Sequence, residues 1–327
     1  MIRRRQFITL LGGAAAAWPL AARAQQAALP VIGYLRVASR TQLPQIEAAF
    51  REGLGSMGFR EGINVATDYR FAGYDYGRLP ALAADLVRSG VAVLHAGDTP
   101  AAVAAKAATT NIPIIFRIGG DPVQLGLVKS PNQPGGNITG VTFLATVTSA
   151  IRLQMLHEAV PGAAIVGLLV NPSDPNSEPD TREVKEAALK LGLELHVVSA
   201  SNPREIDAAF ATLVERRVQA IVIEGDSFFS DRRQQLVALA TRHGMPSIYA
   251  SREFPDAGGL MSYGASNIEP ARQAGIYVGR ILRGEKPANL PVQQSVKVEL
   301  VINLIVAKVL GLDFPVTLLG RADEVIE

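Results

Sequence analysis

Short apolar segments alternate with amphipathic ones along most of this 327-residue chain. Residues 31–35 form the first apolar segment, and Ile46, Ala49, Phe50 and Leu54 after it have the i, i+3, i+4, i+8 spacing of a helix. Strands that are apolar at every position are typical of parallel sheets whose two faces are both covered by helices. The alternation therefore predicts an α/β fold with parallel sheets.

The pattern occurs twice in succession, which predicts two doubly wound lobes. About 300 residues also exceed what one hydrophobic core usually covers. The first unit has expected strands at 31–35, 65–71, 91–95 and 114–118 and expected helices at 79–88 and 100–109. The second unit has expected strands at 164–170, 193–198, 220–224 and 247–250 and expected helices at 179–191, 203–216 and 231–243.

Segments outside these two units predict where the chain crosses between the lobes. A Pro/Gly-rich turn at 131–137 and a strand at 138–143 lead into the second unit. A strand at 259–263, a helix at 270–282 and a helix at 298–311 follow it. We expect three crossings that together form a hinge. The expected boundaries are 30–142 with 259–289 for the N-terminal lobe and 143–258 with 290–327 for the C-terminal lobe.

The first 24 residues have the features of an export signal. An Arg-Arg-x-Phe-Ile motif at 4–8 precedes an apolar segment at 10–20, which is too short to cross a bilayer, since crossing takes roughly 20 apolar residues. The motif resembles twin-arginine signals, and an ordinary secretory signal is the alternative. Ala22-Arg23-Ala24 is a small-x-small cleavage site. We expect cleavage after Ala24 and a periplasmic protein.

Charge and cysteine content exclude several classes of protein. The formal net charge is +2, but four arginines and no acidic residue lie in the leader, so the rest of the chain is near −2. No Lys/Arg cluster or amino-terminal helix-turn-helix indicates a nucleic-acid partner. Because there is no cysteine, disulfides, thiolate metal sites and a lipid-anchoring cysteine are excluded. We expect a freely soluble monomer that is not embedded in a membrane.

The sequence contains no catalytic or cofactor-binding motif. G-x-S-x-G, a phosphate-binding loop and a G-x-G-x-x-G motif after the first strand are all missing. The histidines (His95, His157, His196 and His243) include no helix-spaced pair that could hold a metal. His95 alone ends an expected strand where a ligand crevice would lie. We therefore expect no catalytic residue, no metal and no cofactor.

Polar residues follow the carboxyl ends of the expected strands, where open α/β sheets bind their ligands. Hydroxyls, amides and helix N-termini at these positions suit a small ligand with a carboxylate. Asp98, Asp121 and Asp226 are candidate partners of a ligand ammonium, although Asp98 and Asp121 are also placed to cap the segments after them. The candidate ligand-binding residues are Ser39, Thr41, Asp98, Thr99, Arg117, Asp121, Thr142, Thr146, Asn171, Asp226, Phe228, Tyr249 and Tyr263.

Several segments, together with the leader, resemble the ABC-transporter substrate-binding proteins of the tryptophan/tyrosine type. The resemblance implies a type I periplasmic-binding fold, which has two lobes, three crossovers and a ligand in the cleft. It also implies an ABC permease of the inner membrane as partner, and no catalytic residue. The segments that carry it are PAAVAAKAATTNIPIIF at 100–116, DPVQLGLVKSPNQPGGNITGV at 121–141, YVGRILRGEKPANLPV at 277–292, VINL at 301–304 and ADEVIE at 322–327.

The resemblance implies an aromatic amino acid as a ligand. From the strand ends, the candidates to cover an apolar or aromatic side chain are Phe228, Phe229, Tyr249 and Tyr263. Arg117 departs from the small or uncharged residues that we expect at this place in the family. If Arg117 faces the cleft, it favours a carboxylate, and acids other than aromatic amino acids become candidates. If it faces solvent, it does not inform on the ligand. A ligand-sensing subunit for a membrane receptor is the alternative function.

Overall fold

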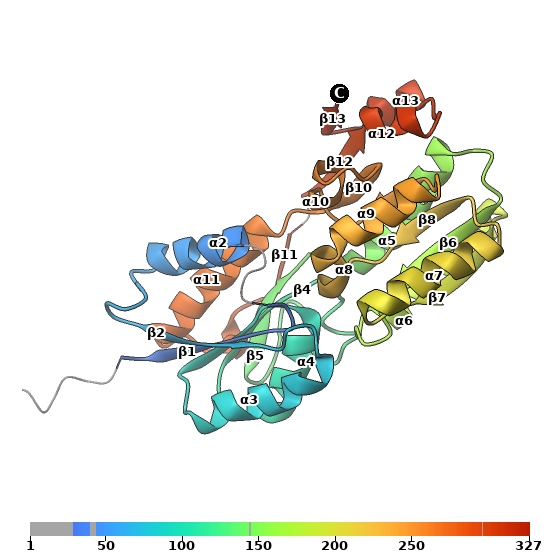
Figure 1. Cartoon of the computed structure of the whole chain (residues 1–327). Coiled ribbons are helices and arrows are strands. Elements are labelled where there is room, and N and C mark those ends of the chain that lie inside the picture. The colour runs from blue at the N-terminus through green and yellow to red at the C-terminus, as the bar shows by residue number, and fades with distance from the viewer. Residues whose placement is uncertain (1–28, 40–43, 144, 296) are drawn as a thin grey trace, which may run out of the picture.

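The computed structural model describes residues 29–39, 44–143, 145–295 and 297–327. Two twisted sheets, each flanked by helices, form two lobes, and the chain passes between them several times (Figure 1). The architecture is α/β, as the alternating pattern predicts. The expected leader at 1–24 lies outside the described residues, so export stays a prediction. None of the helices within the described ranges is long and apolar enough to cross a membrane.

All neighbouring strands of the first lobe's sheet are parallel, in the order β11-β5-β4-β3-β1-β2. Along β1, Ile32 and Tyr34 pack into one core while Leu35 packs into another on the opposite face. Both faces of β1 are therefore buried, which is why this strand has no polar residue before Arg36. The strands are β1 (Val31–Arg36), β2 (Ala66–Phe71), β3 (Val93–Ala96), β4 (Ile114–Ile118), β5 (Ile138–Thr142) and β11 (Gln293–Gln294).

Helices cover each face of the first sheet, with α2 and α11 packed together on one side and α3 and α4 on the other (Figure 1). Gly53 and Gly275 allow the first pair to approach closely, since a Cβ atom on Gly53 would lie 1.9 Å from the carbonyl oxygen of Arg272. The helices are α2 (Pro44–Ser56), η1 (Tyr76–Arg78), α3 (Leu79–Arg88), α4 (Thr99–Ala108), α11 (Ile268–Leu282) and η2 (Pro287–Asn289).

The second lobe's sheet has the order β13-β12-β10-β9-β8-β6-β7, and only the β10–β12 pairing is antiparallel. Its strands are β6 (Ile165–Val170), β7 (Glu194–Ser199), β8 (Ala220–Ile223), β9 (Ser247–Tyr249), β10 (Met261–Ala265), β12 (Val298–Asn303) and β13 (Glu324–Ile326). Its helices are α5 (Ala145–Ala159), α6 (Ser177–Leu191), α7 (Pro203–Glu215), α8 (Ser227–Asp231), α9 (Arg233–Arg242), α10 (Glu253–Asp256), α12 (Leu304–Val309) and α13 (Val316–Leu319).

Two expected lobe boundaries are wrong. We expect the segment from 259 in the N-terminal lobe, but β10 pairs with β9 and β12 in the second sheet. The chain returns to the first lobe only at α11, which packs against α2. We expect the segment from 290 in the C-terminal lobe, but β11 pairs with β5 in the first sheet. Phe143, Asn267 and Ser295 therefore mark the three crossings between the lobes.

The expected helix at 298–311 is also wrong in its first half. Val298–Asn303 is strand β12, and the helix α12 begins only at Leu304, where the Asn303 side chain accepts a hydrogen bond from the Val306 N–H at 3.1 Å. Pairing with β10 on one side and β13 on the other explains the strand. Long-range pairing of this kind overrides a local helical pattern.

Candidate functional site

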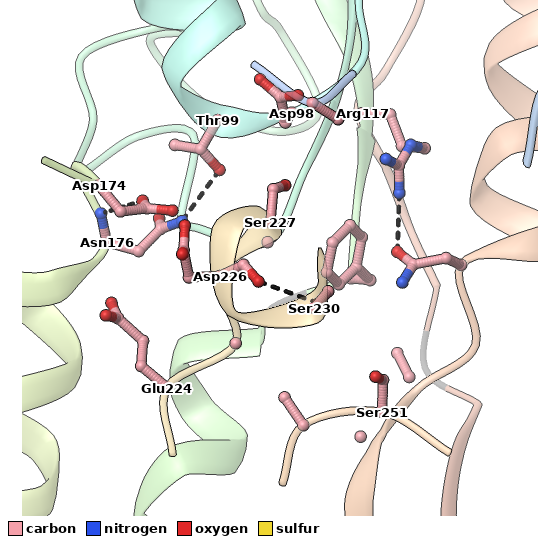
Figure 2. Close-up of a pocket in the computed structure, with 18 of the residues that line it drawn as sticks. Asp98, Thr99, Arg117, Asp174, Asn176, Glu224, Asp226, Ser227, Ser230 and Ser251 are labelled. Atoms are coloured by element: carbon pink, nitrogen blue, oxygen red, sulfur yellow. Dashed lines mark hydrogen bonds between the residues drawn. The ribbon is translucent and has the colours of Figure 1, made fainter. Parts of the chain in front are cut away.

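A cavity of about 90 Å³ lies between the lobes, where the carboxyl ends of strands from both sheets face each other. One enclosed water needs about 10–15 Å³, so the cavity has room for several. Residues at or after the ends of strands from both sheets contribute to its wall, and Figure 2 labels several of the polar ones. The charged side chains on its wall are Arg36, Asp98, Arg117, Arg152, Asp174, Glu224 and Asp226.

Arg36 and Asp98 lie next to each other on the first lobe's side of the cavity. Asp98 accepts hydrogen bonds from the Val37 N–H at 2.9 Å and from the Ala101 N–H at 3.1 Å, so it caps α4 as well as lining the cavity. Its carboxylate lies 3.7 Å from Arg36 Nε. Arg36 is only 2% exposed, and its Nε and Nη1 have no hydrogen-bond partner. A buried donor without a hydrogen-bond partner lowers the stability of the folded protein, so this part of the cavity favours a ligand group that accepts hydrogen bonds.

Arg117 also lines the cavity, so it faces the cleft and not solvent. Its guanidinium donates to Asn267 Oδ1 at 2.7 Å and to the Gly97 carbonyl at 2.5 Å, and it lies over the Phe143 ring (Figure 2). Burial and the nearby Arg36 charge lower the pKa of Arg117 to about 10. Because Phe143 and Asn267 are crossing residues, Arg117 connects the first-lobe wall to the hinge.

Three acids, Asp174, Glu224 and Asp226, form the acid cluster on the second lobe's side of the cavity (Figure 2). Each is less than 8% exposed. Burial and mutual repulsion raise the pKa of Asp174 and of Glu224 well above the ordinary value. Burial also raises the pKa of Asp226. Hydrogen bonds donated to Asp226 by the Tyr76 hydroxyl and by backbone N–H groups partly offset this rise. The two walls therefore differ in sign.

Hydrogen bonds between the lobes hold the cavity closed. The Tyr76 hydroxyl of η1 donates to Asp226 of the second lobe and accepts from Asn171 Nδ2 at 3.1 Å. Asn176 Nδ2 of the second lobe donates to Thr99 Oγ1 of the first at 3.1 Å (Figure 2). Both bonds would break if the lobes moved apart, so the arrangement is a closed state of a hinged molecule.

Of the expected ligand-binding residues, the structure brings Asp98, Thr99, Arg117 and Asp226 to the cavity. Four other polar residues of the expected set lie in the described ranges but do not line the cavity, and two of them have hydrogen bonds with a structural role. Asp121 caps a turn through the Val123 N–H at 2.7 Å, and the Thr142 hydroxyl donates to the Gly120 carbonyl at 2.9 Å. The residues that do not line the cavity are Ser39, Asp121, Thr142 and Asn171.

The expected aromatic cover is wrong. Phe228 and Tyr249 are buried in the second lobe's core, and Tyr249 stacks on Phe254 with ring centroids 4.2 Å apart. Tyr263 is half-buried against the other core of that lobe. Phe254, which the sequence argument did not single out, lines the cavity together with Tyr74 and Phe143.

His95 is a core residue of the first lobe and does not line the cavity. Its ring stacks on Phe50 and packs against Tyr34, and its Nδ1 lies 3.0 Å from the Ile115 carbonyl oxygen. Burial, helped by the Arg117 charge, lowers the pKa of His95 to about 3. Such a histidine stays neutral in the folded protein.

The cavity is also lined by polar residues that are not among the expected ligand-binding residues, namely Arg36, Arg152, Asp174, Asn176 and Glu224. A usable signal existed for two of them, because a charged residue directly ends or follows the apolar strands VIGYLR and AIVI. Thr41 lies outside the described residues, as does the side chain of Thr146. Within the described part of the chain, no group of three His, Asp or Glu side chains is placed to hold a metal.

A hinged, two-lobed α/β protein with an enclosed charged cavity belongs to the class of cleft-binding solute receptors. The chain is a member of the ABC transporter substrate binding protein family, whose family model matches residues 32–326. The resemblance seen in the sequence is thereby confirmed. The fold is the type I periplasmic-binding fold, which solved sugar-binding proteins at 10–13% identity also have.

Individual relatives agree with this assignment. A "Tyrosine-binding protein" of Clostridioides difficile is 26% identical over 272 residues, which are 83% of this chain and 78% of that protein. A Streptococcus pneumoniae ABC domain solved with L-Trp is 27% identical, the match covers 91% of this chain and 100% of that chain, and the TM-score is 0.83. A ligand-free, open substrate binding protein with adhesive properties from Clostridium difficile is 25% identical, covers 91% and 99%, and has a TM-score of 0.64. The better match to the liganded structure agrees with closed lobes.

Proposed function

We propose that this protein is the periplasmic solute receptor of an ABC importer and captures a small carboxylate-bearing ligand between its lobes. The observation that carries this is Arg36, whose Nε and Nη1 are buried on the cavity wall without a hydrogen-bond partner. A guanidinium presents its donors in a planar fork that matches a carboxylate. A ligand carboxylate at Arg36 would satisfy donors that the protein leaves unpaired.

Aromatic amino acids are the first candidate ligands. Tyr74, Phe143 and Phe254 lie on the cavity wall, and offset or edge-on contacts with a ligand ring are favourable. The acid cluster would accept hydrogen bonds from a ligand ammonium. The relatives described as binding tyrosine and as solved with L-Trp support this choice. The charged wall also admits other small carboxylates.

The leader and the family support the proposal of export and transport. The expected twin-arginine signal would deliver the chain to the periplasm, where closure around a ligand gives the permease a shape that it can distinguish from the open form. A ligand shifts the lobes toward closure only by the difference in its contacts with the closed and open states. Arg36 on one lobe and the acid cluster on the other supply such contacts.

The test is a thermal-unfolding screen of the exported protein with amino acids and organic acids. A ligand at about 100 times its Kd stabilises the folded state by about 2.7 kcal/mol, which raises Tm by roughly 5–10 °C for a protein of this size. We expect such a shift with L-tryptophan, L-tyrosine or another small carboxylate. A well-folded sample that none of these compounds stabilises would contradict the proposal.

A further inference from the structure

Residues 72–76, which we call the clasp loop, carry two tyrosines of the first lobe that contact the second lobe. The Tyr74 ring lies edge-on to the Phe228 ring of α8, with the ring centroids 6.2 Å apart, and it packs against the second lobe's core. The Tyr76 hydroxyl donates to the carboxylate of Asp226, which precedes α8. The clasp loop thus contacts α8 and its cap from across the cleft.

The clasp loop is held in place by its own lobe. The Tyr74 N–H donates to the Val37 carbonyl at 2.8 Å, and the Arg78 guanidinium donates to the Ala72 carbonyl at 3.0 Å. Tyr74 has a φ of 66°, a left-handed conformation that is uncommon for residues other than glycine and persists where the surrounding structure enforces it. The Tyr76 ring packs against the first lobe's core. Because these contacts lie within one lobe, the loop keeps its shape when the lobes separate.

The acceptor on the second lobe is also fixed by its own lobe. Asp226 Oδ1 accepts from the Phe228 and Phe229 N–H groups at 3.0 and 3.1 Å. It also accepts from Asn171 Nδ2 at 3.2 Å, whereas Oδ2 accepts from the Tyr76 hydroxyl. Burial and the nearby Asp226 charge raise the pKa of Tyr76 above its ordinary value, so the hydroxyl keeps its proton and remains a donor. Donor and acceptor are therefore both in position for the lobes to meet.

A second contact joins the lobes where α4 and α6 begin. Asn176 Nδ2 donates to Thr99 Oγ1 at 3.1 Å, and a Cβ atom on Gly120 of the first lobe would lie 2.3 Å from Asn176 Oδ1 (Figure 2). Thr99 and Asn176 line the cavity, so a ligand can compete for their hydrogen bonds. Tyr76 does not line the cavity. Its hydroxyl therefore stabilises the closed lobes through a contact that is not made with the ligand.

We propose that the Tyr76 hydroxyl holds the two lobes together in the ligand-free protein and thereby sets ligand affinity without touching the ligand. A ligand that binds the closed state has an apparent Kd equal to its Kd for that state divided by the closed fraction. A group that raises the closed fraction of the ligand-free protein therefore tightens the binding of every ligand of the cavity. Because this equilibrium exists without ligand, it can be measured whether or not the proposed ligand class is correct.

The test is the distance between the lobes in the ligand-free protein, measured by double electron–electron resonance. The chain has no cysteine, so Ala107→Cys on α4 and Glu186→Cys on α6 give two exposed sites for spin labels. Lobe opening breaks the Asn176–Thr99 contact, which joins the starts of these helices, and so lengthens the distance. Tyr76→Phe removes only the hydroxyl. We expect it to lower the ratio of the short-distance to the long-distance population about 10-fold, because a hydrogen bond to a charged group is lost.

Tyr277→Phe is the matched control, because the Tyr277 hydroxyl donates to the Pro291 carbonyl at 2.7 Å within the first lobe. This change should lower Tm, since a hydrogen bond is lost, but should leave the distance between the lobes unchanged. L-tryptophan should bind Tyr76→Phe roughly 10-fold more weakly than the unaltered protein and should bind Tyr277→Phe with unaltered affinity.

The distance measurement decides between the outcomes. The same distance distribution with and without the Tyr76 hydroxyl overturns the inference, and so does an equal change in Tyr277→Phe. Failure of every small carboxylate to stabilise the protein contradicts the proposed function instead, because the ligand-free distances do not depend on it.

Discussion

The two walls of the cavity are built the same way but carry opposite charge. Both consist of residues at the carboxyl ends of parallel strands, yet the first lobe places Arg36 and Arg117 there, whereas the second places Glu224 and Asp226. The first wall has buried donors without hydrogen-bond partners, and the second has buried carboxyl groups whose pKa values are raised by burial and by one another. We infer that the fold determines where the ligand lies and that the residues at the strand ends determine which end of the ligand faces each lobe.

The walls also differ in how they depend on closure. Arg117 donates hydrogen bonds to the Gly97 carbonyl of its own lobe and to the Asn267 side chain at a crossing, so no residue of the second lobe's wall is needed to position it. Asp226, in contrast, accepts a hydrogen bond from the Tyr76 hydroxyl of the first lobe. This hydrogen bond to the acid cluster forms only when the lobes meet. We infer that the first wall is preformed in the open state and that the second is finished by closure.

The largest expected effect is at the first wall. Arg36→Met keeps the length of the side chain but removes the unpaired donors, and we expect the affinity for a carboxylate ligand to fall about 100-fold or more, because hydrogen bonds to charged groups are lost. Calorimetry measures the change. Arg88→Met on α3, where the side chain is exposed, is the matched control and should bind as the unaltered protein does. Retained affinity in Arg36→Met would contradict the role of the first wall.

A smaller expected effect is that the stabilities of the two lobes depend on pH in opposite directions. The pKa of His95 is lowered to about 3, so its contribution to first-lobe stability is complete above about 6.5 and is lost as pH falls toward 3. The pKa of Asp180 is raised to about 6, mainly by burial, so its contribution to second-lobe stability is complete below about 4 and is lost as pH rises through 6.

Hydrogen exchange on the ligand-free protein should therefore show opposite trends. Between pH 7.5 and 4.5, after correction for intrinsic rates, first-lobe core amides should lose protection and second-lobe core amides should gain it. Asp180→Asn should stabilise the protein by about 2 kcal/mol at pH 7.5 and have little effect at pH 4. Asp207→Asn, an exposed change in the same lobe, should have no effect at either pH. Parallel trends in both lobes would contradict the assignment.

The fold was predictable because its signal is local. Apolar runs and helical spacing identified all the long strands of both sheets, apart from β12. The prediction failed for β12 because its apolar residues also have helical spacing, at Val298, Val301, Ile302 and Ile305. Only pairing with β10 and β13 decides between a helix and a strand there. The lobe boundaries failed at β10 and β11 for the same reason, since partner choice is not written in a strand's own sequence.

The site was predictable only in outline. Strand ends correctly located Asp98, Thr99, Arg117 and Asp226 at the cavity. Phe228 was misplaced because the Asp226 side chain accepts hydrogen bonds from the Phe228 and Phe229 N–H groups, and the helix that begins there turns both rings into the core. Which way an aromatic residue after a strand points depends on such capping geometry. Composition and spacing do not specify it.

A crystal structure of the protein with bound L-tryptophan tests the central claim most directly. The account predicts the carboxylate within hydrogen-bond distance of the Arg36 guanidinium and the ammonium against Asp174, Glu224 or Asp226, with the lobes closed. The same ligand bound with its carboxylate on the second lobe, or bound with no contact to Arg36, would contradict the account.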